Sequence, residues 1–127
     1  MSVRLRAQLV AKVMQTDWTQ KLSVALRLQP ERQDWGICNS DARRLDEFIR
    51  FYEANVVDDP WEREALAELI AQSANEAIID GLMSEQLEMR LVQFFRSRHG
   101  EFPQSWEYWT GLRGNPEFPI AALIQRA

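Results

Sequence analysis

The amino-acid sequence predicts an all-α fold, a compact single domain of five to seven helices over residues 1–127. Apolar residues recur three and four positions apart along most of the chain, and no stretch alternates in the manner of a strand. Five glycines and five prolines punctuate the periodic stretches. The chain is 46% hydrophobic and 27% charged, which suits one globular core, and no repeat, low-complexity tract or linker marks a domain boundary.

The first helical region is predicted over residues 3–28, as one long helix or as two abutting helices. In the second case, Asp17 and Gln20 form the capping box at which the second helix begins. Pro30 ends the region, and residues 30–40 show no period, which predicts a loop. The apolar stripe of the first helix consists of Leu5, Leu9 and Val13.

The next helix is expected to run from a cap at Ser40 or Asp41 to about Ala54. Its buried stripe consists of Leu45, Phe48, Ile49 and Tyr52. Its opposite face carries charges spaced for two ion pairs, each worth a few tenths of a kcal/mol. The expected pairs are Arg43–Glu47 and Asp46–Arg50.

The clearest helix start is Asp59-Pro60-Trp61-Glu62. Asp59 accepts a free backbone N–H, Pro60 fits the first helical position, and Glu62 completes a capping box. The helix is expected to reach about Asp80, and Gly81 supplies the left-handed residue that ends it. The inward stripe consists of Leu66, Leu69, Ile70, Ser73 and Ala77. The residues expected to point away are Glu64, Glu68, Gln72 and Asn75.

Three further helices are predicted toward the C-terminus, over residues 84–99, 103–112 and 119–126. A serine cap and a terminating glycine bound the first of them, a proline opens the second, and the third is almost entirely apolar. Most tryptophans are expected to pack in the core. These are Trp61 near a helix start and Trp106 and Trp109, one turn apart on the second helix.

The residues that usually carry catalysis or bind metals are too few to build a familiar site. The single cysteine, Cys38, excludes an internal disulfide and a thiolate zinc cage, and the single histidine, His99, excludes most multi-histidine metal sites. No signature of a Cys–His nucleophile pair surrounds either residue, and phosphate-binding loops and the nucleophile elbow are absent from the sequence. We therefore expect a protein without catalytic residues, metal or cofactor.

The net charge of −4 is unevenly distributed. Residues 34–88 carry fourteen acidic and four basic side chains, a net charge of −10, whereas residues 1–33 carry +4 and residues 89–127 carry +2. An acidic middle attracts basic partners and repels nucleic acid, so direct binding of nucleic acid is not expected. The alternative is a solvated surface on which the acidic middle and the basic ends pair with each other.

The candidate partner-binding residues lie in this acidic middle. Glu64 and Glu68 share the predicted outward face of one helix, and three more acidic residues stand at its start. A tryptophan between an aspartate and a glycine in a polar loop is typical of an interface anchor, although Trp35 is equally expected to fold back onto the core. The candidates are Asp34, Trp35, Asp58, Asp59, Glu62, Glu64 and Glu68.

Several motifs follow one another along residues 43–127. They are Trp61-Glu62-Arg63, Leu66, Glu68-Leu69-Ile70 and Ser73, then Trp106-Glu107-Tyr108-Trp109, then the ending from Pro119-Ile120 to Arg126. In this order the chain resembles small, all-helical bacterial immunity proteins of type VI and other polymorphic toxin systems. The resemblance implies a cytoplasmic protein that binds and neutralises a cognate secreted toxin. Because these are packing motifs, the resemblance carries over no interface residue.

If the toxin acts on nucleic acid or nucleotides, an acidic helical surface is expected to occlude its basic active-site cleft and to speed association. Three alternatives stay open. The first is an adaptor or chaperone that loads a secreted effector, and the second is a small enzyme with a carboxylate site at Asp58, Asp59 and Glu62. The third is a structural homodimer, and the sequence permits either a monomer or a homodimer.

No membrane association is expected from the sequence. A run of about 18 uncharged apolar residues, the length needed to span a bilayer, is missing. The first residues, Met1-Ser2-Val3-Arg4-Leu5-Arg6, are charged and lack the apolar centre of a signal peptide.

Overall fold

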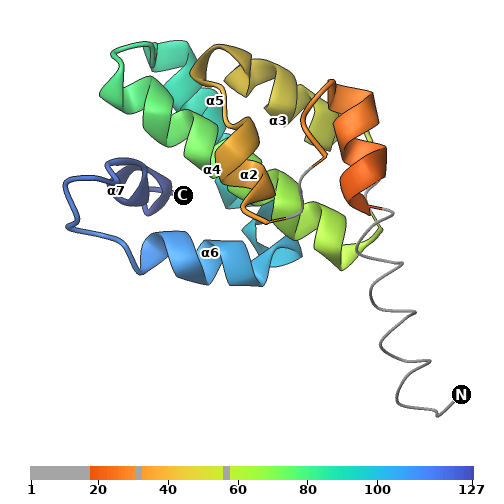
Figure 1. Ribbon diagram of the computed structural model, residues 1–127. Coiled ribbons are helices and arrows are strands. Elements are labelled where there is room, and N and C mark those ends of the chain that lie inside the picture. The colour runs from red at the N-terminus through yellow and green to blue at the C-terminus, as the bar shows by residue number, and fades with distance from the viewer. Residues whose placement is uncertain (1–17, 31–32, 56–57) are drawn as a thin grey trace, which may run out of the picture.

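The computed structural model describes residues 18–30, 33–55 and 58–127. In these ranges every regular element is a helix, which confirms the predicted all-α fold of five to seven helices (Figure 1). A first helix covers residues 18–26, and Asp17 and the predicted stripe before it lie outside the described residues. The other α-helices are α2 (Trp35–Asn39), α3 (Leu45–Ala54), α4 (Pro60–Ile79), α5 (Glu85–Arg98), α6 (Pro103–Thr110) and α7 (Ile120–Ile124). Two 3₁₀ turns, η1 (Ala42–Arg44) and η2 (His99–Glu101), precede α3 and α6.

The predicted helix boundaries are largely confirmed by their caps. Asp41, Asp59 and Ser84 each accept a backbone N–H at the start of η1, α4 and α5, over 2.9 to 3.1 Å. Gly81 follows α4 with a φ of 71°, the left-handed conformation that glycine tolerates best. The first helix ends at residue 26, earlier than predicted, because Arg27 itself turns left-handed with a φ of 57°.

Helix α4 is the centre of the molecule, and α2, α3, α6 and α7 all pack against it (Figure 1). Four fully buried alanines let the neighbouring helices approach its backbone closely. They are Ala67, Ala71, Ala74 and Ala77. The predicted inward stripe is confirmed, since Leu66, Leu69, Ile70 and Ser73 are each fully buried.

One of the residues of α4 expected to point outward is buried, because α4 lies at the centre of the molecule. Asn75 is only 5% exposed. Its amide donates to the carbonyl oxygen of Glu117 at 3.1 Å, and its Oδ1 accepts the backbone N–H of Ile120 at 3.2 Å. Asn75 therefore fixes the start of α7 on the bundle, a contact between distant segments that periodicity does not reveal.

The expected stripe of α3 meets buried side chains of α5 in an aromatic core. Tyr52 packs on Phe94 and Phe102, and Phe95 packs on the same two rings. The centroids of the paired rings lie 5.1 to 5.9 Å apart, mostly edge to face. Burial raises the pKa of the Tyr52 hydroxyl, which donates to Glu101 Oε1 at 2.9 Å. This cluster joins α3 and α5 to Phe102, the residue that precedes α6.

The prediction that residues 30–40 form a loop is wrong in part, because Trp35–Asn39 form α2. A helix of five residues is too short to show a 3.6-residue period, and tertiary contacts stabilise it. Trp35 is 2% exposed and its Nε1 donates to Ser23 Oγ at 2.9 Å. The side-chain amide of Asn39 donates to the carbonyl oxygen of Gln29 at 3.0 Å, which closes the preceding loop.

One of the two predicted ion pairs on α3 is confirmed and the other is wrong. Arg50 Nε lies 2.8 Å from Asp46 Oδ2, as expected. Glu47 pairs with Arg44 at 2.6 Å rather than with Arg43. The reason is that Arg44 also donates to the carbonyl oxygen of Leu26 at 2.6 Å, which holds its guanidinium beside Glu47.

None of the helices in the described ranges combines the length and the apolar character that crossing a bilayer requires.

Candidate functional site

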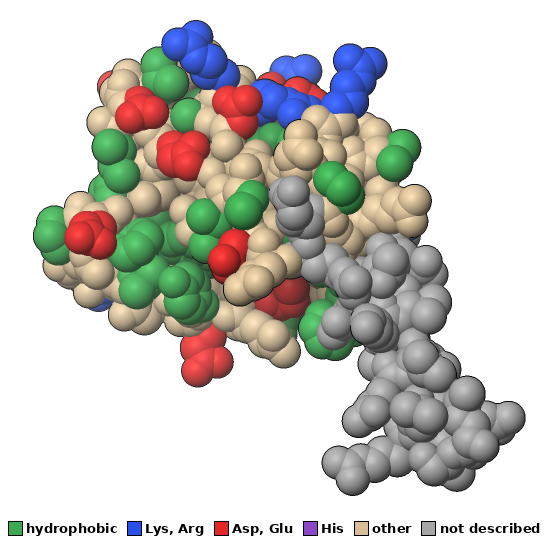
Figure 2. Space-filling model, viewed as in Figure 1, with side chains coloured by type: hydrophobic (Ala, Val, Ile, Leu, Met, Phe, Trp, Pro, Cys, Tyr) green, Lys and Arg blue, Asp and Glu red, His purple; other side chains and the backbone are tan. Residues whose placement is uncertain are grey.

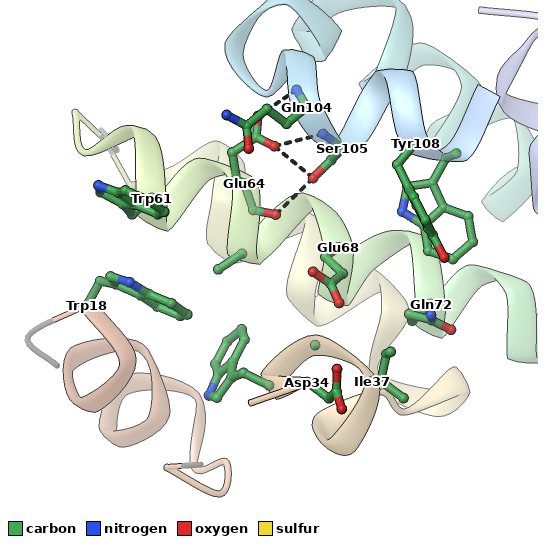
Figure 3. Close-up of a pocket in the computed structure, with 14 residues that line it drawn as sticks. Trp18, Asp34, Ile37, Trp61, Glu64, Glu68, Gln72, Gln104, Ser105 and Tyr108 are labelled. Carbon is green, nitrogen blue, oxygen red and sulfur yellow. Dashed lines mark hydrogen bonds between the residues drawn. The ribbon is translucent and has the colours of Figure 1, made fainter. Parts of the chain in front are cut away.

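A groove with a volume of about 470 Å³ opens where α2 and α6 flank α4. Figure 3 shows α4 as its floor, with α6 on one side and the first helix and α2 on the other. We call it the acidic groove, because three carboxylates line it, those of Asp34, Glu64 and Glu68. On this face most of the visible lysine and arginine side chains gather along one edge, whereas acidic and hydrophobic side chains occupy the middle (Figure 2).

Glu64 has a structural role in the wall of the acidic groove. Its carboxylate accepts the backbone N–H groups of Gln104 at 3.1 Å and Ser105 at 2.7 Å, together with the Ser105 hydroxyl at 3.0 Å (Figure 3). Helix α6 has no capping side chain of its own, since Phe102 stands at its N-cap position. Glu64 supplies that cap from α4 and so fastens α6 beside the groove.

Glu68 and Asp34 differ from Glu64 because their carboxylates do not stabilise another part of the fold. Among the described residues, neither carboxylate has a hydrogen-bond or ion-pair partner. Burial raises the pKa of Glu68, and the nearby negative charges of Asp34 and Glu64 raise it further. The centre of the groove therefore favours the approach of a positive charge.

Aromatic side chains line both ends of the acidic groove. Trp18 and Trp61 lie at one end and Tyr108 at the other (Figure 3). Trp61 is 52% exposed and Tyr108 is 59% exposed, so the prediction that Trp61 packs in the core is wrong. Of the seven large hydrophobic side chains that are exposed in the described ranges, Ile37, Trp61 and Tyr108 line this groove. This concentration of exposed apolar surface is typical of a binding site.

The structure brings four of the seven predicted partner-binding residues together. Asp34, Trp35, Glu64 and Glu68 all line the acidic groove. The indole of Trp35 forms part of its wall but is buried, which is the second of the two expectations for this residue. Trp35 also packs edge to face with Trp18, at 5.7 Å between ring centroids.

The other three predicted residues do not line the groove. Asp59 caps α4, and the backbone carbonyl of the exposed Asp58 accepts from Arg63 at 2.9 Å. Glu62 was expected to complete a capping box, but it is 6% exposed and its carboxylate accepts from Lys21 Nζ at 3.1 and 3.3 Å. Glu62 therefore joins α4 to the first helix.

Trp61, Gln72 and Tyr108 also line the groove, although the sequence did not single them out as binding residues. One signal was present, since Trp61, Glu64, Glu68 and Gln72 recur at intervals of three and four and so share one face of α4. Tyr108 gave no such signal, because only the packing of α6 on α4 brings it to the groove.

The remaining chemistry-bearing side chains occupy separate surroundings. Cys38 is exposed on α2, whereas the His99 ring stacks on Trp106 with 4.4 Å between centroids. Within the described ranges, no group of three or more His, Cys, Asp or Glu side chains is arranged to hold a metal ion. Comparisons with protein-family models, curated proteins and solved structures find no match.

Proposed function

We propose that this protein binds a basic surface of another protein in the acidic groove and thereby neutralises it, as a cytoplasmic immunity protein neutralises a cognate toxin. The observation that carries the proposal is the pair of carboxylates without partners, Asp34 and Glu68, in an open groove with exposed aromatic ends. Protein interfaces use aromatic side chains for affinity. They use charges opposite in sign to those of the partner for selectivity.

The structure narrows the acidic surface expected from the sequence. Glu64 is engaged at α6 and Glu62 with Lys21, so the free charge of α4 near the groove is that of Glu68. The role in toxin neutralisation is supported by the resemblance of the motifs from Trp61 to Ser73, and by an acidic charge that suits a basic catalytic cleft. A toxin that acts on nucleic acid or nucleotides has such a cleft, and blocking it stops the reaction.

The test uses the product of the gene beside the one for this protein, which we expect to contain a toxic domain. We expect the full chain to rescue cells that produce that domain, and the purified proteins to form an inactive complex. The variant Asp34→Asn/Glu68→Gln should associate about tenfold more slowly at low salt, and the difference should shrink as salt screens the charge. Asp80→Asn removes an exposed carboxylate at the far end of α4 and should associate like the wild type.

Two results would contradict the proposal. One is the absence of both rescue and a complex. The other is a complex in which the toxic domain keeps its activity while its export changes, which is the behaviour of an adaptor or chaperone.

A further inference from the structure

We infer that the acidic groove receives an arginine side chain of the partner, flanked in the partner's chain by apolar residues. This inference rests on the proposed function and specifies what the groove recognises.

The centre of the groove selects the charged group. Asp34 approaches it from the turn before α2 and Glu68 from α4, so two carboxylates without partners face one space (Figure 3). A guanidinium carries five N–H donors in one plane and can donate to two carboxylates at once, which a compact ammonium does less well. It is also more weakly hydrated, so it loses less on entering a site where Glu68 is partly buried.

The two ends of the groove select the neighbours of that arginine. The volume of the groove, about 470 Å³, exceeds that of one arginine side chain. Trp18 and Trp61 lie at one end, and Ile37 and Tyr108 lie at the other, with Glu68 between the two ends (Figure 3). An arginine with an apolar residue on each side places its charge on the carboxylates and its neighbours on these side chains.

The test titrates the purified full chain with three short peptides and follows its tryptophan fluorescence. The peptides are acetyl-Leu-Arg-Leu-amide, the same peptide with citrulline, which keeps the shape of arginine without its charge, and the same peptide with lysine. The arginine peptide should bind with a dissociation constant below about 1 mM, the citrulline peptide at least tenfold more weakly, and the lysine peptide about threefold more weakly.

Variants locate the binding in the groove. Glu68→Gln should weaken binding of the arginine peptide about tenfold, and Trp61→Ala about fivefold, while both proteins keep cooperative thermal unfolding. Asp80→Asn is the matched control for lost charge, and Met89→Ala is the control for a lost exposed apolar side chain, since Met89 is 70% exposed outside the groove. Both controls should bind like the wild type.

The inference is overturned if the arginine peptide shows no saturable binding, if citrulline or lysine binds as tightly, or if Glu68→Gln binds unchanged. Its failure differs from failure of the proposed function. If the wild type and Glu68→Gln neutralise the toxic domain equally well, the inference about arginine is contradicted and the proposed function is not. Peptide binding with these preferences, in a protein that rescues no cell, removes toxin neutralisation and keeps the arginine site.

Discussion

Two glutamates one turn apart on α4 have opposite relations to the fold. Glu64 accepts three hydrogen bonds from the first turn of α6, so its charge stabilises the native structure. Glu68 has no partner among the described residues and carries a raised pKa, so its charge is a cost to the native structure. Uncompensated charge in a groove is typical of a residue kept for binding rather than for stability.

The substitution Glu64→Gln should destabilise the protein. The amide has one oxygen where the carboxylate has two, and its NH₂ group would face the donors of Gln104 and Ser105. We expect a loss of about 1.5 kcal/mol in the free energy of unfolding and a drop of about 5 °C in the melting temperature. An unchanged melting temperature in a calorimetric scan would show that α6 does not depend on this cap.

The substitution Glu68→Gln should instead stabilise the protein at pH 7, by about 2 °C in melting temperature. The pKa of Glu68 is raised above its ordinary value of 4.5, so the native state binds the proton more tightly than the unfolded state does. Stability from this group is therefore full below pH 4.5 and is lost as the pH rises through the native pKa.

The pH dependence separates this account from a general effect of the substitution. The difference in melting temperature between Glu68→Gln and the wild type should be present at pH 7 and absent at pH 3, where glutamate is neutral in both states. A stabilisation that persists at pH 3, or a destabilisation at pH 7, would mean that the charge of Glu68 is not held at a cost.

Helix α2 shows where prediction from this sequence stops. The helices with several turns were predicted because their apolar residues recur with the helical period and their caps are polar residues such as Asp59 and Ser84. Helix α2 depends on contacts of Trp35 with Ser23 and on the close approach of Gly36 to α4. Such contacts join residues far apart in the chain, so no local pattern encodes them.

The substitution Gly36→Ala tests that close approach. A Cβ at this position would lie 3.0 Å from Glu68 Cγ and 3.1 Å from the backbone nitrogen of Leu69, so the packing of α2 on α4 must loosen by a few tenths of an ångström. We expect a loss of about 2 kcal/mol in the free energy of unfolding by denaturant. Gly100→Ala is the matched control, because a Cβ there meets nothing within 4 Å. Equal stability of the two variants would contradict this packing.

The charge distribution of the protein and its acidic groove were predictable to different degrees. The acidic middle of the chain and the candidates Asp34, Glu64 and Glu68 followed from the sequence. Their convergence in one groove did not follow from the sequence, since only the packing of α2 and α6 on α4 brings them together. The outward face expected for α4 is instead the floor of a groove, because α2 and α6 cover its sides.

The indole N–H resonances of the ¹⁵N-labelled full chain report whether the partner binds in the acidic groove. Trp61 lines the groove and is 52% exposed, whereas Trp106 packs on His99 and Phe95 outside it. The resonances are assigned by Trp61→Phe and Trp106→Phe. On addition of the toxic domain that we expect the neighbouring gene to encode, the Trp61 signal should shift and the Trp106 signal should stay. A complex in which the Trp61 signal does not move would contradict binding in the acidic groove.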